Sequence, residues 1–150
     1  MISSHQPTIF DNSILAAVSS KDDGNMKFRV AGSTEDDSSI ISNRAAFLSQ
    51  IGIEMDDSVL VQITYDRDDY VRMRAVTNTD KGAGMYEPNS TEPADALATR
   101  SKGVALFLPL ADCVGAIIHD PVKDVIMVSH LGRHSTVQGG AKTNIEFLQT

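Results

Sequence analysis

The chain has 150 residues, of which 41% are hydrophobic, and its formal net charge is −7, so one acidic domain spanning residues 1–150 is expected. The acidic balance argues against a nucleic-acid partner, because proteins that bind nucleic acids mostly contact the phosphate backbone through basic side chains. The single cysteine cannot form an internal disulfide, and no apolar run approaches the ~20 residues that span a membrane, so we expect a cytoplasmic protein with no membrane partner.

The first predicted elements form a hairpin. Residues 14–19 are apolar and predict a short strand, and the polar cluster at 20–25 predicts a turn. Residues 26–31 then return as a second strand. Lys21 lies in the polar cluster, and on the sequence alone a solvated turn is its simplest interpretation.

A helix is predicted over residues 39–51. Several residues before it can cap a helix N-terminus, and Gly52 is typical of a helix stop. Ile41, Ala45 and Leu48 recur at helical spacing and predict the buried face. Taken alone, Arg44 in the same segment is interpreted as a surface residue.

The middle of the chain predicts a second hairpin and a loop. Residues 59–65 are strand-like, a charged turn follows, and residues 70–76 alternate polar and apolar side chains, so the two segments predict an antiparallel pair. From 77 to 93 the composition shifts to turn-forming residues and predicts a long irregular loop.

The last third predicts three buried strands and a helix. The apolar runs at 104–110, 114–118 and 125–129 are each bounded by turn residues. The only cysteine, Cys113, and a histidine, His130, therefore follow strand ends, where loops carry function on a rigid sheet. A helix is predicted over about 136–149.

This region resembles the laccase-domain family, the YfiH-like proteins first described as multicopper polyphenol oxidases and now understood as zinc-dependent purine nucleoside phosphorylases. The family's Ala-Asp-Cys is matched by residues 111–113, and its Asp-Pro turn by residues 120–121. Its His-Ala-Gly-Trp-Arg-Gly is replaced by His-Leu-Gly-Arg-His-Ser at 130–135, and the Cys-to-His separation of 17 positions is kept. The Asn-Arg pair at 43–44 also matches.

The resemblance implies an α/β fold, a layered sandwich with a mixed β-sheet and packed helices. It covers nearly all of this chain but only the first part of a family domain, so we expect an open sheet edge and either a homo-oligomer or a complementing chain. The implied substrates are a purine nucleoside, adenosine or inosine, and phosphate, and the implied cofactor is zinc.

The resemblance also implies roles for individual residues. Cys113 and His130 would be metal ligands, and Asp112 would be catalytic, orienting a ligand or a proton. The implied substrate-binding residues are Lys21, Arg44 and Arg133.

One departure weakens this assignment. The family's first ligand histidine is replaced by Thr64, and a hydroxyl is a poor zinc ligand. His134, four residues after His130, is the stronger candidate for a replacement ligand, and His119 is the weaker one.

Several alternatives stay open. The chain could be a non-catalytic relative that binds a ligand or a partner protein. Cys113 could instead be a small buried apolar residue, or a nucleophile activated by a histidine. Copper-dependent phenol oxidation has little support, because a three-copper cluster requires many more than the four histidines present.

Overall fold

The computed structural model describes residues 6–10, 14–28 and 34–150 of the chain. The helices and strands are α1 (Asp37–Gln50), β1 (Ser58–Leu60), β2 (Met73–Ala75), β3 (Ala96–Thr99), β4 (Ala105–Phe107), β5 (Val114–Asp120), β6 (Val125–Leu131), α2 (Arg133–Val137) and α3 (Gly140–Gln149). No helix in the described ranges is both long enough and apolar enough to span a bilayer.

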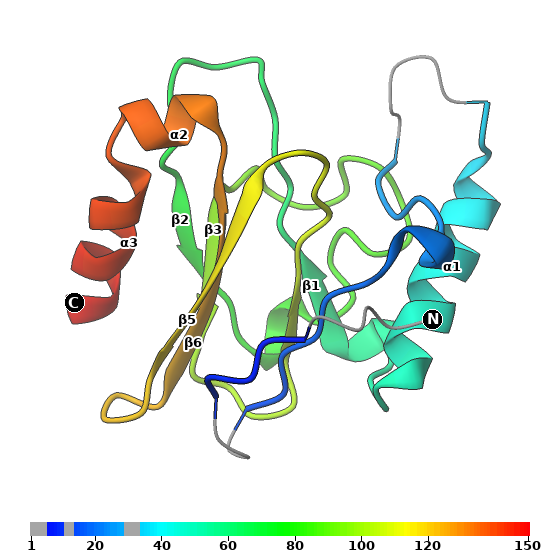
Figure 1. Cartoon of the computed structure of the whole chain (residues 1–150), viewed down its shortest axis with the longest axis horizontal. Coiled ribbons are helices and arrows are strands. Elements are labelled where there is room, and N and C mark those ends of the chain that lie inside the picture. The colour runs from blue at the N-terminus through cyan, green and yellow to red at the C-terminus, as the bar shows by residue number, and fades with distance from the viewer. Residues whose placement is uncertain (1–5, 11–13, 29–33) are drawn as a thin grey trace.

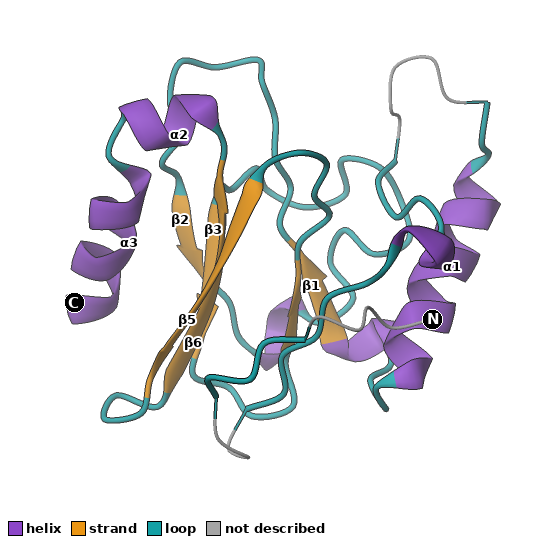
Figure 2. Ribbon diagram, in the orientation of Figure 1, coloured by secondary structure: helices purple, strands orange, loops and turns teal. Residues whose placement is uncertain are grey.

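The elements form layers, with helices outside and sheets inside (Figures 1 and 2). One sheet has the strand order β2-β3-β6-β5, and the other pairs β1 with β4 in parallel. The larger sheet is mixed, because β2 and β3 are parallel while β6 is antiparallel to both β3 and β5. The predicted layered α/β sandwich with a mixed sheet is confirmed.

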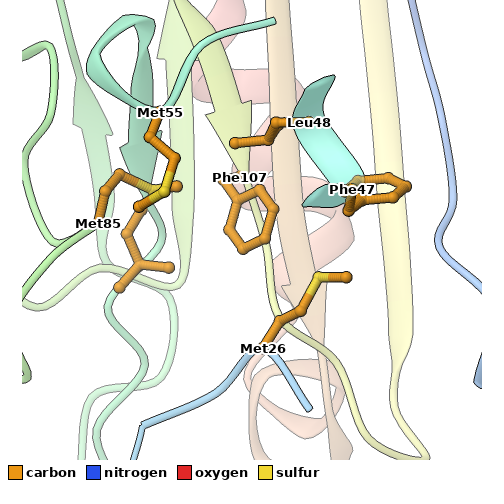
Figure 3. Packing of buried hydrophobic residues seen from close by; sticks show 7 residues of the cluster. Met26, Phe47, Leu48, Met55, Met85 and Phe107 are labelled. Atoms are coloured by element: carbon orange, nitrogen blue, oxygen red, sulfur yellow. The ribbon is translucent and has the colours of Figure 1, made fainter. Parts of the chain in front are cut away.

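Each interface between layers has its own apolar core. Leu148 of α3 packs on Ala98 and Met127 of the larger sheet. Between the sheets, Val59 and Leu97 belong to a second cluster. The third cluster, which includes Phe47 and Phe107, lies between α1 and the smaller sheet (Figure 3). Burial of apolar surface in three successive interfaces is what holds the layers together.

Helix α1 begins and ends where the sequence predicts, within two residues. Asp36 caps it by accepting a hydrogen bond from the Ser39 backbone N–H, and Gly52 follows its end with φ of 72°. The buried face differs from the prediction: Ala45 is exposed and Arg44 is buried. The interpretation of Arg44 as a surface residue is therefore wrong.

The antiparallel pairing of residues 59–65 with 70–76 is also wrong. β1 and β2 belong to different sheets, and each pairs in parallel with a strand that follows much later in the chain. All three residues of β1 are buried, because β1 has the core of α1 on one side and the second sheet on the other. Parallel strands that are covered on both faces are joined by crossover connections, so a nearby turn does not determine which strand pairs with β1.

The C-terminal hairpin is confirmed, with β5 and β6 longer than predicted, but β5 lies at a sheet edge and is not buried. The last helix begins later than predicted, because Gly139 has φ of 76° and separates α2 from α3. The polar turn at 20–25 contains a short 3-10 helix capped by Ser20. Within the described residues, 14–28 hold no strand, and the rest of the predicted return strand, 29–31, lies outside them.

Candidate functional site

Cys113 and His130 lie at the same end of the β5–β6 hairpin. Gly115 of β5 is paired with His130, and Val114 is paired with Leu131. Side chains alternate between the faces of a strand, so Cys113, two residues before Gly115, is on the same face of the hairpin as His130. The hairpin thus brings together a thiol and an imidazole that are 17 positions apart in the sequence.

Gly132 leaves the space between these two side chains. A Cβ atom placed on Gly132 would lie 3.0 Å from His130 Nε2 and 3.6 Å from Cys113 Sγ, so the two atoms are no further apart than the sum of these distances. Zinc ligands of this kind, bound at 2.0–2.3 Å in a tetrahedral geometry, are separated by about 3.6 Å. Cys113 and His130 therefore border the same space beside Gly132.

His130 is buried, with 6% of its surface exposed. Its backbone N–H donates to the Asp95 carbonyl at 2.8 Å. Burial lowers the pKa of the imidazole below its ordinary 6.5, Asp95 opposes the shift, and Lys27 adds to it. His130 is consequently neutral at neutral pH, the form that can accept a proton or coordinate a metal.

A network of three side chains, Thr64, Arg72 and Asp95, is connected to His130 through the Asp95 backbone. Arg72 donates through Nε to Asp95 Oδ2 at 2.8 Å and through Nη1 to Thr64 Oγ1 at 3.0 Å. Asp95 is almost fully buried, with 1% of its surface exposed. Tyr65 follows Thr64, and the charges of Cys113 and Asp95 contribute, after burial, to raising the pKa of its hydroxyl. Thr64 is therefore linked through Arg72 to Asp95, whose backbone carbonyl accepts the His130 N–H.

This donor set does not complete a zinc site. No three His, Cys, Asp or Glu side chains within the described ranges are grouped so that they could hold a metal ion. Cys113 and His130 supply two suitable donors. At the third position Thr64 accepts a hydrogen bond from the Arg72 guanidinium, whose positive charge disfavours a second cation nearby.

The remaining predicted site residues are more dispersed. Asp112 is exposed and has φ of 64°, the left-handed region, at the turn before β5. Arg133, the first residue of α2, and Lys21, in the 3-10 turn at 21–23, are both exposed. His134 stacks on the Tyr70 ring with centroids 4.5 Å apart.

The weaker histidine candidate, His119, contacts Phe10 edge-on at 6.5 Å. It is paired with Ile126, four ladder positions beyond the Gly115–His130 pair and toward the opposite end of the hairpin.

Sequence reasoning missed Arg72 and Asp95. Asp95 carried a signal, since a carboxylate directly before the apolar segment 96–98 is unusual for a buried strand and requires a partner. Arg72 carried none, because its partner lies 23 positions away.

The chain was compared with known proteins. A family profile described as "Multi-copper polyphenol oxidoreductase laccase" matches residues 17–150. Purine nucleoside phosphorylase YlmD from Bacillus subtilis is 32% identical over 103 residues, which are 68% of this chain and 36% of that protein. Adenosine deaminase RL5 from an unknown prokaryotic organism is 30% identical over 71% of this chain and 40% of its own length.

Two solved structures share the fold. YlmD from Geobacillus stearothermophilus superposes with a TM-score of 0.74 and 25% identity, over 84% of this chain and 44% of that one. The Bacillus licheniformis hypothetical protein YfiH gives a TM-score of 0.73 with 24% identity, over 81% of this chain and 43% of that one. This chain thus covers less than half the length of each of these relatives.

Proposed function

The chain belongs to the multi-copper polyphenol oxidoreductase laccase family, and we propose that it acts as a purine nucleoside phosphorylase on adenosine and inosine. Relatives named as purine nucleoside phosphorylases support the reaction class. The observation that carries the proposal is that Cys113 Sγ and His130 Nε2 lie 3.6 Å and 3.0 Å from the position that a Cβ atom on Gly132 would take.

Phosphorolysis requires two events at the nucleoside. A phosphate oxygen bonds to the anomeric carbon of the ribose while the bond from that carbon to the base nitrogen breaks, and the base leaves with the electron pair and takes up a proton. In the proposed assignment Asp112, beside Cys113, orients a ligand or moves this proton. Lys21 and Arg133, both exposed, would contact the substrate from the rim.

Zinc enters the proposal through two residues only. A Cys113 thiolate and the neutral His130 imidazole are ligand types that zinc prefers, and bound zinc would make a water molecule acidic near neutral pH. The described residues provide no third ligand, so they do not fit a catalytic zinc, and we assign no step of the reaction to a metal.

The test is phosphate-dependent release of hypoxanthine from inosine, measured together with the zinc content of the same purified sample. We expect turnover that requires phosphate and that is lost in Cys113→Ala. His119→Ala is the matched control, because it removes an imidazole at the other end of the hairpin and should leave turnover unchanged. A folded sample without turnover would refute the proposal, whatever its zinc content.

A second function is favoured by the Arg72 network. Thr64 replaces a ligand histidine and is bonded to a buried ion pair. This arrangement is expected of a site that has lost its metal and still binds a nucleoside or a partner. A non-catalytic protein that binds a nucleoside or a partner chain would show saturable nucleoside binding without product.

An open sheet edge supports the partner part of this alternative. β5 is an edge strand, and its Val114 is 63% exposed, so a second copy or a complementing chain could pair with it. The mass of the protein in solution, measured by light scattering, distinguishes a monomer from an assembly.

A further inference from the structure

Arg44 of α1 is a buried arginine, with 1% of its surface exposed. Its Nε donates to the Met26 carbonyl at 2.8 Å, and its Nη1 donates to the carbonyls of Gly84 and Met85 at 3.0 Å and 2.8 Å. The guanidinium carbon also lies 4.2 Å from the centroid of the Phe28 ring. These contacts fix the position and orientation of the guanidinium group.

The charge of Arg44 has no counter-ion in the part of the chain that the structure describes. Its partners are backbone carbonyls and aromatic rings, and its Nη2 donates to no acceptor there. Burial lowers its pKa to about 10, so the group is still charged at neutral pH. A buried charge without an ionic partner is costly, and buried charges are normally paired with a group of opposite charge.

A cavity of about 60 Å³ adjoins this group. A single water requires only ~10–15 Å³ on the same scale, so the cavity can hold a tetrahedral oxyanion. Its lining residues include Arg44, Lys27 and two amide residues, Gln62 and Asn89, whose side chains are hydrogen-bonded to each other, and none of the lining residues is acidic. Two cations and two amides, with no carboxylate, are the donors that bind an anion.

Lys27 connects the cavity to the Cys113–His130 pair. Its Nζ lies 5.8 Å from the centroid of the Tyr65 ring, and its charge is close enough to act on the His130 imidazole. Tyr65 in turn is close enough to Cys113 for the thiolate charge to act on its hydroxyl. Lys27, which lines the cavity, and Tyr65 therefore link the cavity to the proposed nucleoside site.

We propose that this cavity, which is lined by Arg44 and Lys27, binds inorganic phosphate. The assignment of that phosphate as the second substrate rests on the proposed phosphorylase function. The anion site itself depends only on the cavity and its charges.

The test is titration of the purified chain with inorganic phosphate, followed by calorimetry in chloride buffer of matched ionic strength. We expect saturable binding to the wild-type chain and at least tenfold weaker binding to Lys27→Gln. Lys142→Gln is the matched control: it removes an equally positive charge from the exposed face of α3, on the opposite side of the molecule, and should bind phosphate as the wild type does (Figure 1).

Arg44→Gln should remove binding altogether, but it also deletes three hydrogen bonds to the backbone, so circular dichroism must show that this variant is folded. If Arg44→Gln is not folded, the comparison of Lys27→Gln with the wild type still tests the proposal. Absence of saturable binding to the wild type, or equal binding to Lys27→Gln and Lys142→Gln, would overturn the proposal. Phosphate binding without inosine turnover would retain the anion site and refute the phosphorylase.

Discussion

The guanidinium group of Arg72 donates to both carboxylate oxygens of Asp95, at 2.8 Å and 3.2 Å. Arg72 lies just before β2 and Asp95 just before β3, so this ion pair joins the two strands at the end where the candidate site lies. The Arg72 side chain is 12% exposed and that of Asp95 is 2% exposed. Little solvent is therefore present to replace either partner.

Arg72→Met should lower the free energy of unfolding by about 3–5 kcal/mol, because it leaves the Asp95 carboxylate buried without its partner. Urea denaturation measures the change. Lys142→Met is the control, since it breaks an exposed ion pair with Glu146 and should change stability by less than about 0.5 kcal/mol. Equal effects of the two substitutions would mean that the Arg72–Asp95 pair is not buried in solution.

Thr64→His should introduce a third zinc ligand. The new imidazole would stand beside Cys113 and His130 and would release Arg72 from its bond to Thr64. After removal of metal with a chelator, we expect titrated zinc to bind at about one ion per chain, as three protein ligands allow. Thr91→His, which disrupts a similar contact with Arg74 elsewhere, should not gain zinc.

Gly132→Ala should distort the candidate site without straining the backbone. Gly132 has φ of −79°, which any residue adopts, so the effect is steric. The added Cβ would lie 2.7 Å from His130 Cε1, and the imidazole must move away from Cys113. We expect a loss of about 1–3 kcal/mol of stability and the disappearance of inosine turnover. If this variant turned over inosine as the wild type does, the activity would not depend on the Cys113–His130 pair.

His130 should make stability depend on pH in a window that carboxylates do not share. Its pKa in the folded chain is below its ordinary 6.5, so the unfolded chain binds the proton more tightly. The free energy of unfolding should be constant above that value and should fall as pH is lowered from 6.5 toward the folded pKa.

Thermal unfolding at pH 5 to 8, with chelator present, measures this dependence. His130→Gln should flatten the profile in this range, and His119→Gln should retain it. An unchanged profile in His130→Gln would contradict the assignment.

Asn144→Leu should stabilise the chain. Asn144 of α3 is fully buried, and neither atom of its amide has a hydrogen-bond partner in the described residues. Replacing an unsatisfied amide with an apolar side chain of similar size should raise the free energy of unfolding by about 1–2 kcal/mol. A loss of stability would show that the amide makes a bond that the substitution removes.

The sequence predicted where elements lie better than it predicted how they pair. Helix α1 and the β5–β6 hairpin carry local signals, namely a capping aspartate, a glycine stop and an Asp-Pro turn. The pairing of β1 with β4 carries none, because it joins residues 47 positions apart, Ser58 and Ala105. Only the packing of two sheets against each other selects that partner.

The candidate site was predictable to the same extent. Cys113 and His130 lie on one hairpin, so their approach follows from local pairing. Arg44 was interpreted from its charge as a surface residue, although it occupies the i+4 position after the buried Ile40, on the face that continues to Phe47. The helical spacing placed Arg44 on the buried face, but its charge led to its interpretation as a surface residue.

The candidate site also draws its groups from both sheets. Thr64 and Tyr65 follow β1 of the smaller sheet, whereas Asp95, Cys113 and His130 belong to the ends of strands in the larger one. A small molecule bound among them would contact residues of both sheets at once. Its binding would raise the free energy of unfolding of the chain, and the two layers would separate less often when it is bound.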